Sequence, residues 1–372
     1  MPIDTQVEAV LRALAKHRNV LLTGPPGAGK SRIMAEVAKR FATRAGQGTA
    51  FAPGGTVLFP PQEDLPDWFP ARTRTQPKVW SMTFHQDTKY RDFVYGILPK
   101  LGVGQTGFSL TRGTLLLASE HAQHANGASL ITIDEINRGP AVSVFGDAIT
   151  AIEVDKRLNE SGEETHLTAF MQTVGDDGQP QRIALPSHLY ILAAMNEADT
   201  SIAPLDVAFR RRFYPIEIQP EEGALAAFLG LLTDTEPPQP GGTETPEDIY
   251  RTVVAAWREM NRKLAIVRGP AYQLGHGALM ATTPPDEPTK DGALAFATAC
   301  WHMMKQHVQE ILFDDVRLQA EVLGASATSP LKMVEHSVGE QDYPTLEGPT
   351  IGPANVLAAL RSMARLAQGQ AA

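Results

Sequence analysis

The chain has 372 residues, 43% of them hydrophobic, so its length predicts two domains, or three, and it can bury a sizeable core. Its formal net charge of −9 argues against a protein that coats nucleic acid through bulk positive charge. No apolar run reaches about 18 residues, so we expect no membrane span. The start, MPIDTQVEAV, lacks the apolar core of a signal peptide, and the single cysteine, Cys300, excludes an internal disulfide and fits a reducing cytoplasm.

The first predicted elements are a helix, a short strand and a second helix. Apolar residues at helical spacing run through residues 7–14, and residues 5–8 (TQVE) have the pattern of a capping box at a helix start. An apolar strand is expected at residues 20–23, and a helical apolar stripe occupies residues 33–41. Between them, residues 24–31 read GPPGAGKS and match G-x-x-x-x-G-K-[ST].

This glycine-rich segment is a phosphate-binding loop in its required context, after a strand and before a helix. Glycines let backbone N–H groups converge on phosphate oxygens, and the start of the following helix adds a positive field. Lys30 is expected to reach the β- and γ-phosphates, and Ser31 is expected to hold Mg²⁺. The residues expected to line the nucleotide are Gly24, Pro25, Pro26, Gly27, Ala28, Gly29, Lys30 and Ser31.

A second motif, SLITIDEINRGP, places two carboxylates at the end of a strand. Residues 130–133 (LITI), a predicted buried strand, are followed directly by Asp134 and Glu135. A carboxylate at a strand tip beside a phosphate loop is where Mg²⁺ needs a supporting anion, and the adjacent Glu135 can polarise an attacking water. The alternative is a solvated acidic turn after a core strand, and the phosphate loop upstream argues against it.

The predicted strands define a fold class. They are residues 20–23, 79–84, 130–133, 189–195 and 213–218. Because helical segments lie between most of them, they predict an α/β fold with a parallel, helix-covered sheet. Ligands of such sheets bind at the carboxyl ends of the strands.

The tetrapeptide Asn196-Glu197-Ala198-Asp199 resembles the NKxD motif with which small GTPases read guanine. It follows the fourth strand, so Asn196 is expected in the same crevice as Asp134, near the γ-phosphate and far from the base. We therefore interpret Asn196 and Asp199 as a sensor of the γ-phosphate and the attacking water. The guanine match is then coincidental.

Three consecutive arginines, Arg210, Arg211 and Arg212, follow a stretch that can form a short helix, residues 204–210. An arginine supplied in trans to a γ-phosphate is an established device in phosphoryl transfer. We predict this role for Arg211 and Arg212. The alternative is a structural cluster that pairs with nearby carboxylates or a helix end.

Together the phosphate loop, the IDEINR box, the MNxxD cluster and the RRRF run resemble the McrB family, the AAA+ motor subunits of McrBC-type restriction systems. Further stretches support the resemblance. Residues 83–99 are similar to the family's FHxSxxYEDFxxGxxP segment, residues 144–157 to the helix after its acidic box, residues 272–279 (YQLGHGAL) to its lid motif FQIGHSYF, and residues 308–315 to QEYFYDD.

The resemblance implies an AAA+ P-loop NTPase with a parallel five-stranded sheet and a C-terminal helical lid, assembled into hexameric rings. It implies hydrolysis of GTP rather than ATP. It also implies a McrC-type nuclease subunit that stimulates hydrolysis and cuts DNA, so that this chain contacts DNA indirectly, through the complex. By resemblance, phosphate and Mg²⁺ are bound by Gly24, Gly29, Lys30, Ser31 and Asp134. The attacking water and the γ-phosphate are contacted by Glu135, Asn196 and Asp199. Arg211 and Arg212 act in trans, and Arg138 is a weaker candidate near the phosphates.

Three features depart from the family pattern. The chain starts at the motor, whereas the best-known members carry an N-terminal DNA-reading domain. Thr200 stands where an arginine often follows the aspartate of MNxxD. Residues 51–77 form a long insertion whose six prolines are expected to forbid a regular strand or helix. Trp68 and Phe69 in it could contact a partner, but we expect them to pack locally under the loop.

The expected domains are a motor, residues 1–219, and a helical lid, residues 220–372. Residues 233–246 have the composition of a flexible connector, and residues 156–187 are expected to form a hairpin or a pore-facing loop. In the lid, residues 249–265, 293–323 and 355–366 are expected to be mainly helical. Asp314 and Asp315 lie on a solvated face or at a break between two lid helices.

Two functions from different classes remain open at this point. One is a motor subunit of a restriction or phage-defence complex. The other is a MoxR-like AAA+ chaperone that remodels protein partners. MNxxD and YQLGH favour the first. The choice between GTP and ATP, the DNA signal and the nuclease partner are not determined by the sequence.

Overall fold

The structure, a computed structural model, describes residues 3–44, 65–102, 105–175, 179–198, 205–231, 244–281, 289–339 and 341–365. It divides into two compact units. The sheet unit consists of Met1–Thr23 and Lys30–Glu217, and the helical unit consists of Gly24–Gly29 and Ile218–Ala372. The chain therefore crosses from one unit to the other and back within the phosphate loop.

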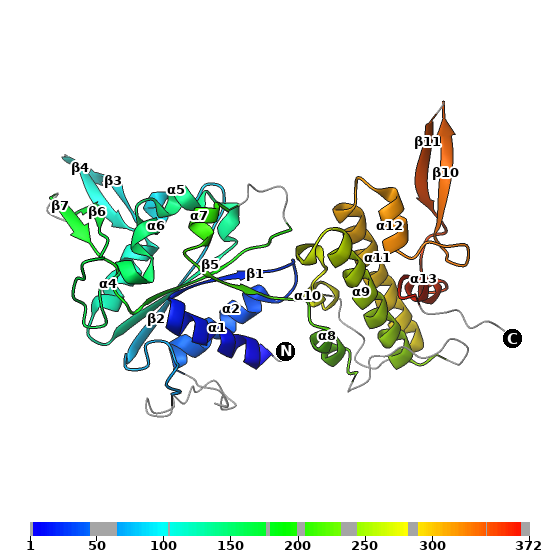
Figure 1. Cartoon of the computed structure of the whole chain (residues 1–372), viewed down its shortest axis with the longest axis horizontal. Coiled ribbons are helices and arrows are strands. Elements are labelled where there is room, and N and C mark those ends of the chain that lie inside the picture. The colour runs from blue at the N-terminus through cyan, green and yellow to red at the C-terminus, as the bar shows by residue number, and fades with distance from the viewer. Residues whose placement is uncertain are drawn as a thin grey trace. The chain divides into compact units, whose positions relative to one another are not determined.

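The sheet unit is built on a parallel sheet (Figure 1). Its five strands have the order β2-β5-β8-β1-β9. Their bounds are Gln76–Thr83 (β2), Gly127–Asp134 (β5), Leu189–Ala194 (β8), Asn19–Thr23 (β1) and Tyr214–Glu217 (β9). All five predicted strands and the parallel sheet are confirmed. Ile133 of β5 lies opposite Ala193 of β8, so the residues that follow these strands emerge at the same edge of the sheet.

Helices cover both faces of this sheet (Figure 1). On one side lie α1 (Ile3–His17) and α2 (Lys30–Thr43), and on the other lie α4 (Thr114–Gln123), α5 (Ala141–Phe145) and α6 (Ala148–Ala151). Leu21, Ile131 and Ile191 pack in one core cluster with Leu116 of α4 and Phe145 of α5. Because side chains alternate along a strand, the neighbouring strand residues are turned toward α1 and α2. The apolar runs of the sequence reflect burial on both faces.

The predicted capping box at residues 5–8 is wrong. Helix α1 already includes Ile3, so Thr5 lies inside the helix. The first turn carries Asp4, whose negative charge suits the positive end of the helix dipole. The helix therefore starts earlier than the Thr-x-x-Glu pattern indicates.

Two antiparallel hairpins extend the sheet unit. The first joins β3 (Tyr95–Gly102) to β4 (Gln105–Arg112) and follows the short helix α3 (Tyr90–Phe93). Sequence analysis missed it, because Gly96 and Pro99 interrupt the strand pattern. The second joins β6 (Met171–Val174) to β7 (Pro180–Ile183) and lies within the region expected to form a hairpin or a pore-facing loop. The hairpin is confirmed, and its place in a pore stays a prediction.

The proline-rich insertion is described only from residue 65 onward, and residues 51–64 lie outside the described residues. Phe69 is buried, in agreement with local packing, and the Arg12 guanidinium lies 4.1 Å above the Trp68 ring. The expectation that its prolines forbid a strand is wrong at the end of the segment, because Pro77 is part of β2. Since β2 is an edge strand of the sheet, the missing N–H of proline is tolerated there.

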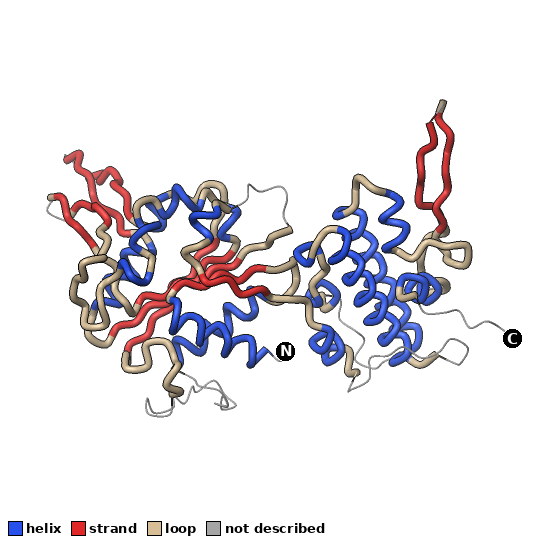
Figure 2. The backbone as a smooth tube through the Cα atoms, in the orientation of Figure 1, coloured by secondary structure: helices blue, strands red, loops and turns tan. Residues whose placement is uncertain are grey.

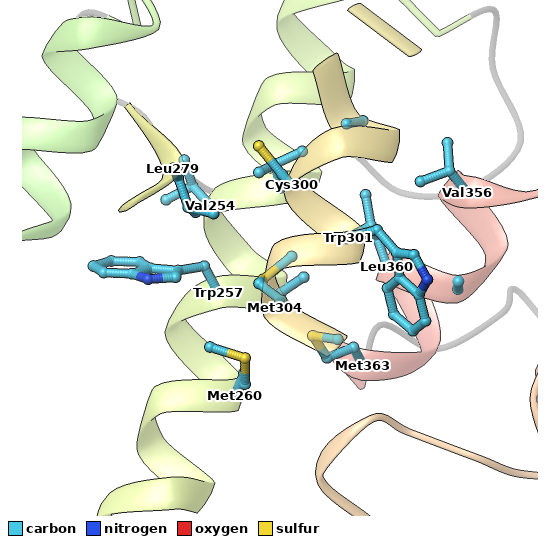
Figure 3. Packing of buried hydrophobic residues seen from close by; sticks show 14 of the residues in the cluster. Val254, Trp257, Met260, Leu279, Cys300, Trp301, Met304, Val356, Leu360 and Met363 are labelled. Carbon is cyan, nitrogen blue, oxygen red and sulfur yellow. The ribbon is translucent and has the colours of Figure 1, made fainter. Parts of the chain in front are cut away.

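The helical unit has one apolar core formed by its long helices (Figure 3). Its helices are α8 (Glu222–Phe228), α9 (Pro246–Val267), α10 (His276–Leu279), α11 (Lys290–Ile311), α12 (Val316–Val322) and α13 (Val356–Met363). Trp257 and Met260 of α9 pack in the same cluster as Trp301 and Met304 of α11 and Leu360 of α13. The three long predicted helical segments are therefore confirmed in outline.

Several boundaries in this unit follow from capping. Thr245 and Asp248 exchange capping hydrogen bonds over 3.2 and 2.9 Å, so α9 begins at Pro246, inside the expected connector. The rest of that connector, residues 233–243, lies outside the described residues. Asp315 caps α12 by accepting from the N–H of Leu318 over 2.9 Å, which confirms a break between two helices at the Asp-Asp pair.

A hairpin of β10 (Lys332–Val338) and β11 (Gln341–Glu347) extends beyond the helices of this unit (Figure 2). Both strands are largely exposed, so they have no buried face that would give a clear alternating pattern in the sequence. This explains why sequence analysis did not predict the hairpin. Among the residues that the structure describes, no helix is both long enough and apolar enough to cross a membrane.

Candidate nucleotide site

The acidic motif ends β5 at the carboxyl edge of the sheet. Asp134 is the last residue of the strand, and its Oδ1 accepts a hydrogen bond from the backbone N–H of Glu135 over 3.0 Å. Glu135 has left-handed backbone angles, with φ of 53° and ψ of 44°, before the 3-10 helix η2 (Ile136–Arg138). Such angles are unfavourable for a residue with a side chain and tend to occur at functional sites. The turn separates the two adjacent carboxylates, so each can have a different partner.

The first partner is a hydroxyl from the start of α2. Ser31 Oγ donates to Asp134 Oδ2 over 3.0 Å, although 103 residues separate them in sequence. Magnesium prefers oxygen ligands and commonly binds through one or two carboxylates together with substrate phosphates. A hydroxyl and a carboxylate that meet in this way fit Mg²⁺. The predicted neighbours Ser31 and Asp134 are thus brought together.

The second partner is the amide of Asn196, which follows β8. Asn196 Nδ2 donates to Glu135 Oε1 over 3.0 Å, and Asn137 Nδ2 donates to the backbone oxygen of Asn196 over 3.1 Å. The other oxygen of Glu135 lies 3.2 Å from Arg138 Nε, without the alignment of a hydrogen bond. Asn196 is therefore beside Glu135, and Arg138 lies at the same cluster. Asp199 and Thr200 lie outside the described residues.

Lys30 begins α2 and is buried, with 7% of its surface exposed. Burial lowers the pKa of Lys30 to about 8, because desolvation disfavours the ammonium form. The carboxylates of Glu135, Asp134 and Glu197 act in the opposite direction. The lysine and the strand-end carboxylates thus share one electrostatic environment within the sheet unit.

The loop of residues 24–29 packs against the lid motif inside the helical unit. Gly275 N–H donates to the carbonyl of Pro26 over 3.0 Å, and Gly277 N–H donates to the carbonyl of Gly27 over 2.9 Å. A Cβ at Gly275 would overlap the backbone of Gly27, and one at Gly277 would lie 2.9 Å from the Gly27 oxygen. Both lid positions therefore require glycine.

His276 lies between these two glycines and is buried. Its Nδ1 accepts from the backbone N–H of Glu221 over 3.1 Å, which leaves Nε2 as the protonated nitrogen of a neutral ring. A Cβ built on Gly29 would lie 3.7 Å from Nε2, so the ring borders the phosphate loop. Sequence analysis found this motif only through the family resemblance and gave it no contact. The pair of glycines flanking a histidine was the available signal.

The arginines have different environments. Arg210, at the end of α7 (Val207–Arg210), lies 3.3 Å from Glu197, and Arg212 lies 2.9 Å from Glu153 and also donates to a backbone carbonyl over 2.9 Å. Arg211 is exposed and forms no ion pair with any residue that the structure describes. Arg212 therefore has partners in its own subunit, whereas the Arg211 guanidinium is available.

Comparison of the sequence with known proteins finds an AAA domain and two relatives from restriction systems. The model of the AAA domain (dynein-related subfamily) matches residues 70–213. The type IV methyl-directed restriction enzyme EcoKMcrB subunit of Escherichia coli (strain K12) is 30% identical over 279 residues, which cover 73% of this chain and 50% of that protein. The type II restriction enzyme BsuMI component YdiS of Bacillus subtilis (strain 168) is 28% identical over 218 residues, which cover 55% and 57%. Among solved structures, NtrX from Brucella abortus matches with a TM-score of 0.33 and 12% identity, over 88% of this chain and 65% of that one.

The AAA match covers strands β2, β5 and β8 with the strand-end carboxylates, and the phosphate loop follows β1 of the same sheet, so the chain is a P-loop NTPase of the AAA+ class. The two sequence relatives, both components of restriction enzymes, indicate which group of AAA+ proteins it resembles. It is a McrB-like AAA+ subunit. The chain spans about half the length of the curated relatives that it matches.

Proposed function

We propose that this chain hydrolyses a nucleoside triphosphate, with GTP preferred over ATP, as the motor subunit of a McrBC-like restriction complex. The observation that carries the proposal is the pair of contacts at neighbouring strand ends, Ser31 with Asp134 and Asn196 with Glu135. They supply, side by side, an oxygen pair suited to a divalent cation and a carboxylate oriented by an amide. Both are needed when water attacks a phosphoryl group.

The phosphates would be held by the backbone N–H groups of the loop and by Lys30. Ser31 and Asp134 would hold Mg²⁺, which neutralises charge on the phosphate oxygens when bound. Lys30 adds a positive charge from a buried position, where water screens it less than at the surface.

Glu135 would orient the attacking water and accept its proton. The hydrogen bond from Asn196 keeps one oxygen of Glu135 fixed, and Asp199 completes the sensor in this proposal. The remaining oxygen of Glu135 is buried beside Arg138 and has no hydrogen bond within the described residues, so it would be the oxygen that accepts from a water bound with the nucleotide.

Arg211 and Arg212 would act on the nucleotide of the next subunit in a hexameric ring. A guanidinium brought to the γ-phosphate in trans can accelerate hydrolysis by about 10³ to 10⁵. The exposed Arg211 can act without losing an ion pair to the described residues. Arg212 would first have to exchange Glu153 for phosphate.

The relatives support a role in restriction over one in protein remodelling, since both carry restriction in their names. We propose a cytoplasmic complex in which nucleotide hydrolysis drives a McrC-like nuclease subunit, with DNA met through the complex. The base preference for GTP rests on the family resemblance alone.

The test is hydrolysis by the purified chain with GTP and with ATP, over a range of protein concentrations, with and without the nuclease subunit from the same source. Hydrolysis that rises faster than linearly with protein concentration, prefers GTP and increases with the nuclease subunit is expected. Absence of hydrolysis of either nucleotide under all these conditions would contradict the proposal.

Mixed rings test the arginines. The donor chain carries Glu135→Gln and can only supply arginines, and the acceptor chain carries Arg211→Ala with Arg212→Ala and can only supply a phosphate site. Each is expected to be poorly active alone, and their mixture is expected to exceed the sum. Mixed rings that form without any gain would return both arginines to a structural role.

A further inference from the structure

A fully buried arginine lies at the base of the sheet unit. Arg157 has 2% of its surface exposed. Its guanidinium donates to the carbonyl of Ile152 over 2.9 and 3.0 Å, to Asn19 Oδ1 over 2.6 Å, and to the carbonyl of Leu189. All of these acceptors are neutral. The single side chain thus joins the residue after α6 to the first residues of β1 and β8.

Asn19 extends this network to the arginines of the proposed trans site. It is buried, with 1% exposed, and its Nδ2 donates to the carbonyl of Ile152 over 2.8 Å and to the carbonyl of Arg212 over 3.1 Å. One amide therefore accepts from Arg157 on one side and fixes the backbone of Arg212 on the other. We call Asn19 and Arg157 the buried clamp.

The side chain of Arg212 returns to the same segment. Its Nε donates to the carbonyl of Ile149 over 2.9 Å and lies 2.9 Å from Glu153 Oε1. The clamp fixes Ile152 between these two residues. Both the backbone and the side chain of Arg212 are therefore held in place relative to residues 149–153. Arg211 directly precedes Arg212, so its backbone is held as well.

Stability alone is a poor explanation for the clamp. Burial lowers the pKa of Arg157 to about 9, so the group is still charged near neutral pH and its desolvation is not compensated by a carboxylate among its hydrogen-bond partners. A buried charge without an opposite charge beside it costs stability rather than adding to it. A guanidinium with several fixed acceptors instead sets the relative geometry of the segments that it joins.

We propose that Asn19 and Arg157 are positioning residues that fix the backbone from which Arg211 and Arg212 reach the nucleotide of the neighbouring subunit. This inference rests on the proposed trans role of those arginines. It requires the clamp to matter in the subunit that donates arginines, and to matter little in the subunit that binds the nucleotide.

The test places Asn19→Asp in either the donor chain or the acceptor chain of the mixed rings defined above. Aspartate can still accept from Arg157, but it loses the donation to Arg212 and sets a carboxylate oxygen against two carbonyls. We expect the activity of the mixture to fall about tenfold or more when the donor chain carries the substitution, given the size of trans-arginine effects. In the acceptor chain, whose arginines are already removed, we expect a change of less than about twofold.

Ser129→Ala is the matched control, because Ser129 is buried in the same sheet, its Oγ accepts from Trp80 Nε1 over 3.3 Å, and no hydrogen bond joins its side chain to Asn19 or Arg157 among the described residues. Ser129→Ala should change the activity of the mixed rings equally whether the donor or the acceptor chain carries it. Arg157→Lys, which keeps the charge and loses the fork of donors, is the second variant should Asn19→Asp fail to form rings, and it must show the same asymmetry.

The positioning role would be overturned if Asn19→Asp lowered the activity of the mixed rings equally in the donor and the acceptor chain, or did not lower it in the donor chain. The activity of the mixture without this substitution would still support the trans arginines. An inactive unsubstituted mixture would instead overturn the trans role itself, and the clamp's proposed purpose with it. The two failures are therefore distinguished by one set of measurements.

Discussion

Asn196 and Glu135, 61 residues apart, are joined by a hydrogen bond of 3.0 Å from Nδ2 to Oε1. The amide holds one oxygen of the carboxylate at the carboxyl edge of the sheet, where β5 and β8 end side by side. Neither residue is oriented by its own strand alone. The first two predictions separate what each of them contributes.

Glu135→Gln should bind nucleotide normally and hydrolyse it about 10² to 10⁴ times more slowly, because glutamine keeps the oxygen that Asn196 contacts and loses the charge that accepts a proton. Single-turnover hydrolysis and nucleotide titration measure the two effects. Glu120→Gln, an exposed carboxylate 2.8 Å from Arg112, is the control and should be unaffected. Near-normal turnover of Glu135→Gln would remove Glu135 from the chemistry.

Asn196→Ala should leave Glu135 charged and unfixed. We expect turnover to fall about tenfold to a hundredfold with little change in nucleotide affinity, since orientation of a general base is lost and binding groups are kept. Titration with a non-hydrolysable nucleotide measures affinity separately from rate. An equal loss of affinity and rate would instead mean that Asn196 binds the nucleotide in its ground state.

Asp199→Asn distinguishes a sensor from a base reader. A sensor aspartate should lose turnover while the ratio of GTP to ATP hydrolysis stays the same. A guanine reader should change its preference toward xanthine nucleotides, because the exchanged amide matches the other base. Hydrolysis of guanine, adenine and xanthine nucleotides by the same preparation is the measurement, and a switch to xanthine would contradict the placement of this motif at the γ-phosphate.

Gly275→Ala should weaken nucleotide binding. Its Cβ would overlap the backbone of Gly27, so the loop or the lid segment must shift, and the loop's N–H groups lose their alignment on the phosphates. We expect Kd to rise about tenfold or more, which corresponds to about 1.4 kcal/mol. Gly223→Ala in α8 is the matched control, because nothing lies within 4 Å of the added methyl. Wild-type affinity in Gly275→Ala, measured by titration calorimetry, would show that the loop does not depend on this contact.

Nucleotide binding should become linked to protons above neutral pH. Burial lowers the pKa of Lys30 to about 8 in the free protein, and phosphate favours the ammonium form. Below about pH 8 the charge is already present, and above it binding must first restore a proton, so Kd should rise by up to about tenfold per pH unit.

Calorimetry in two buffers of different ionisation enthalpy measures this uptake, which should grow between about pH 7 and about pH 9. Lys39→Met removes a half-exposed lysine of the same helix and should leave the uptake unchanged. Proton uptake that is absent or constant over this range would show that Lys30 stays charged in the free protein.

The sequence by itself determined the parts of this protein whose signal is local. The strand, the phosphate loop and the helix after it are contiguous, and the three central strands β1, β5 and β8 are largely apolar runs because the sheet is buried on both faces there. Asp134 and Asn196 could be assigned to one edge because parallel strands end together. The capping pattern predicted the wrong start for α1, because the helix already includes the residues before that pattern.

Only the tertiary structure decided which polar groups meet. The clamp of Asn19 and Arg157 spans 138 residues, and the contact of Gly275 with Pro26 joins a lid motif to a loop near the start of the chain. The ion pair of Arg212 with Glu153 belongs to the same class. No periodicity encodes such pairs, because a side chain's hydrogen-bond partner depends on how distant elements pack and not on its neighbours in sequence.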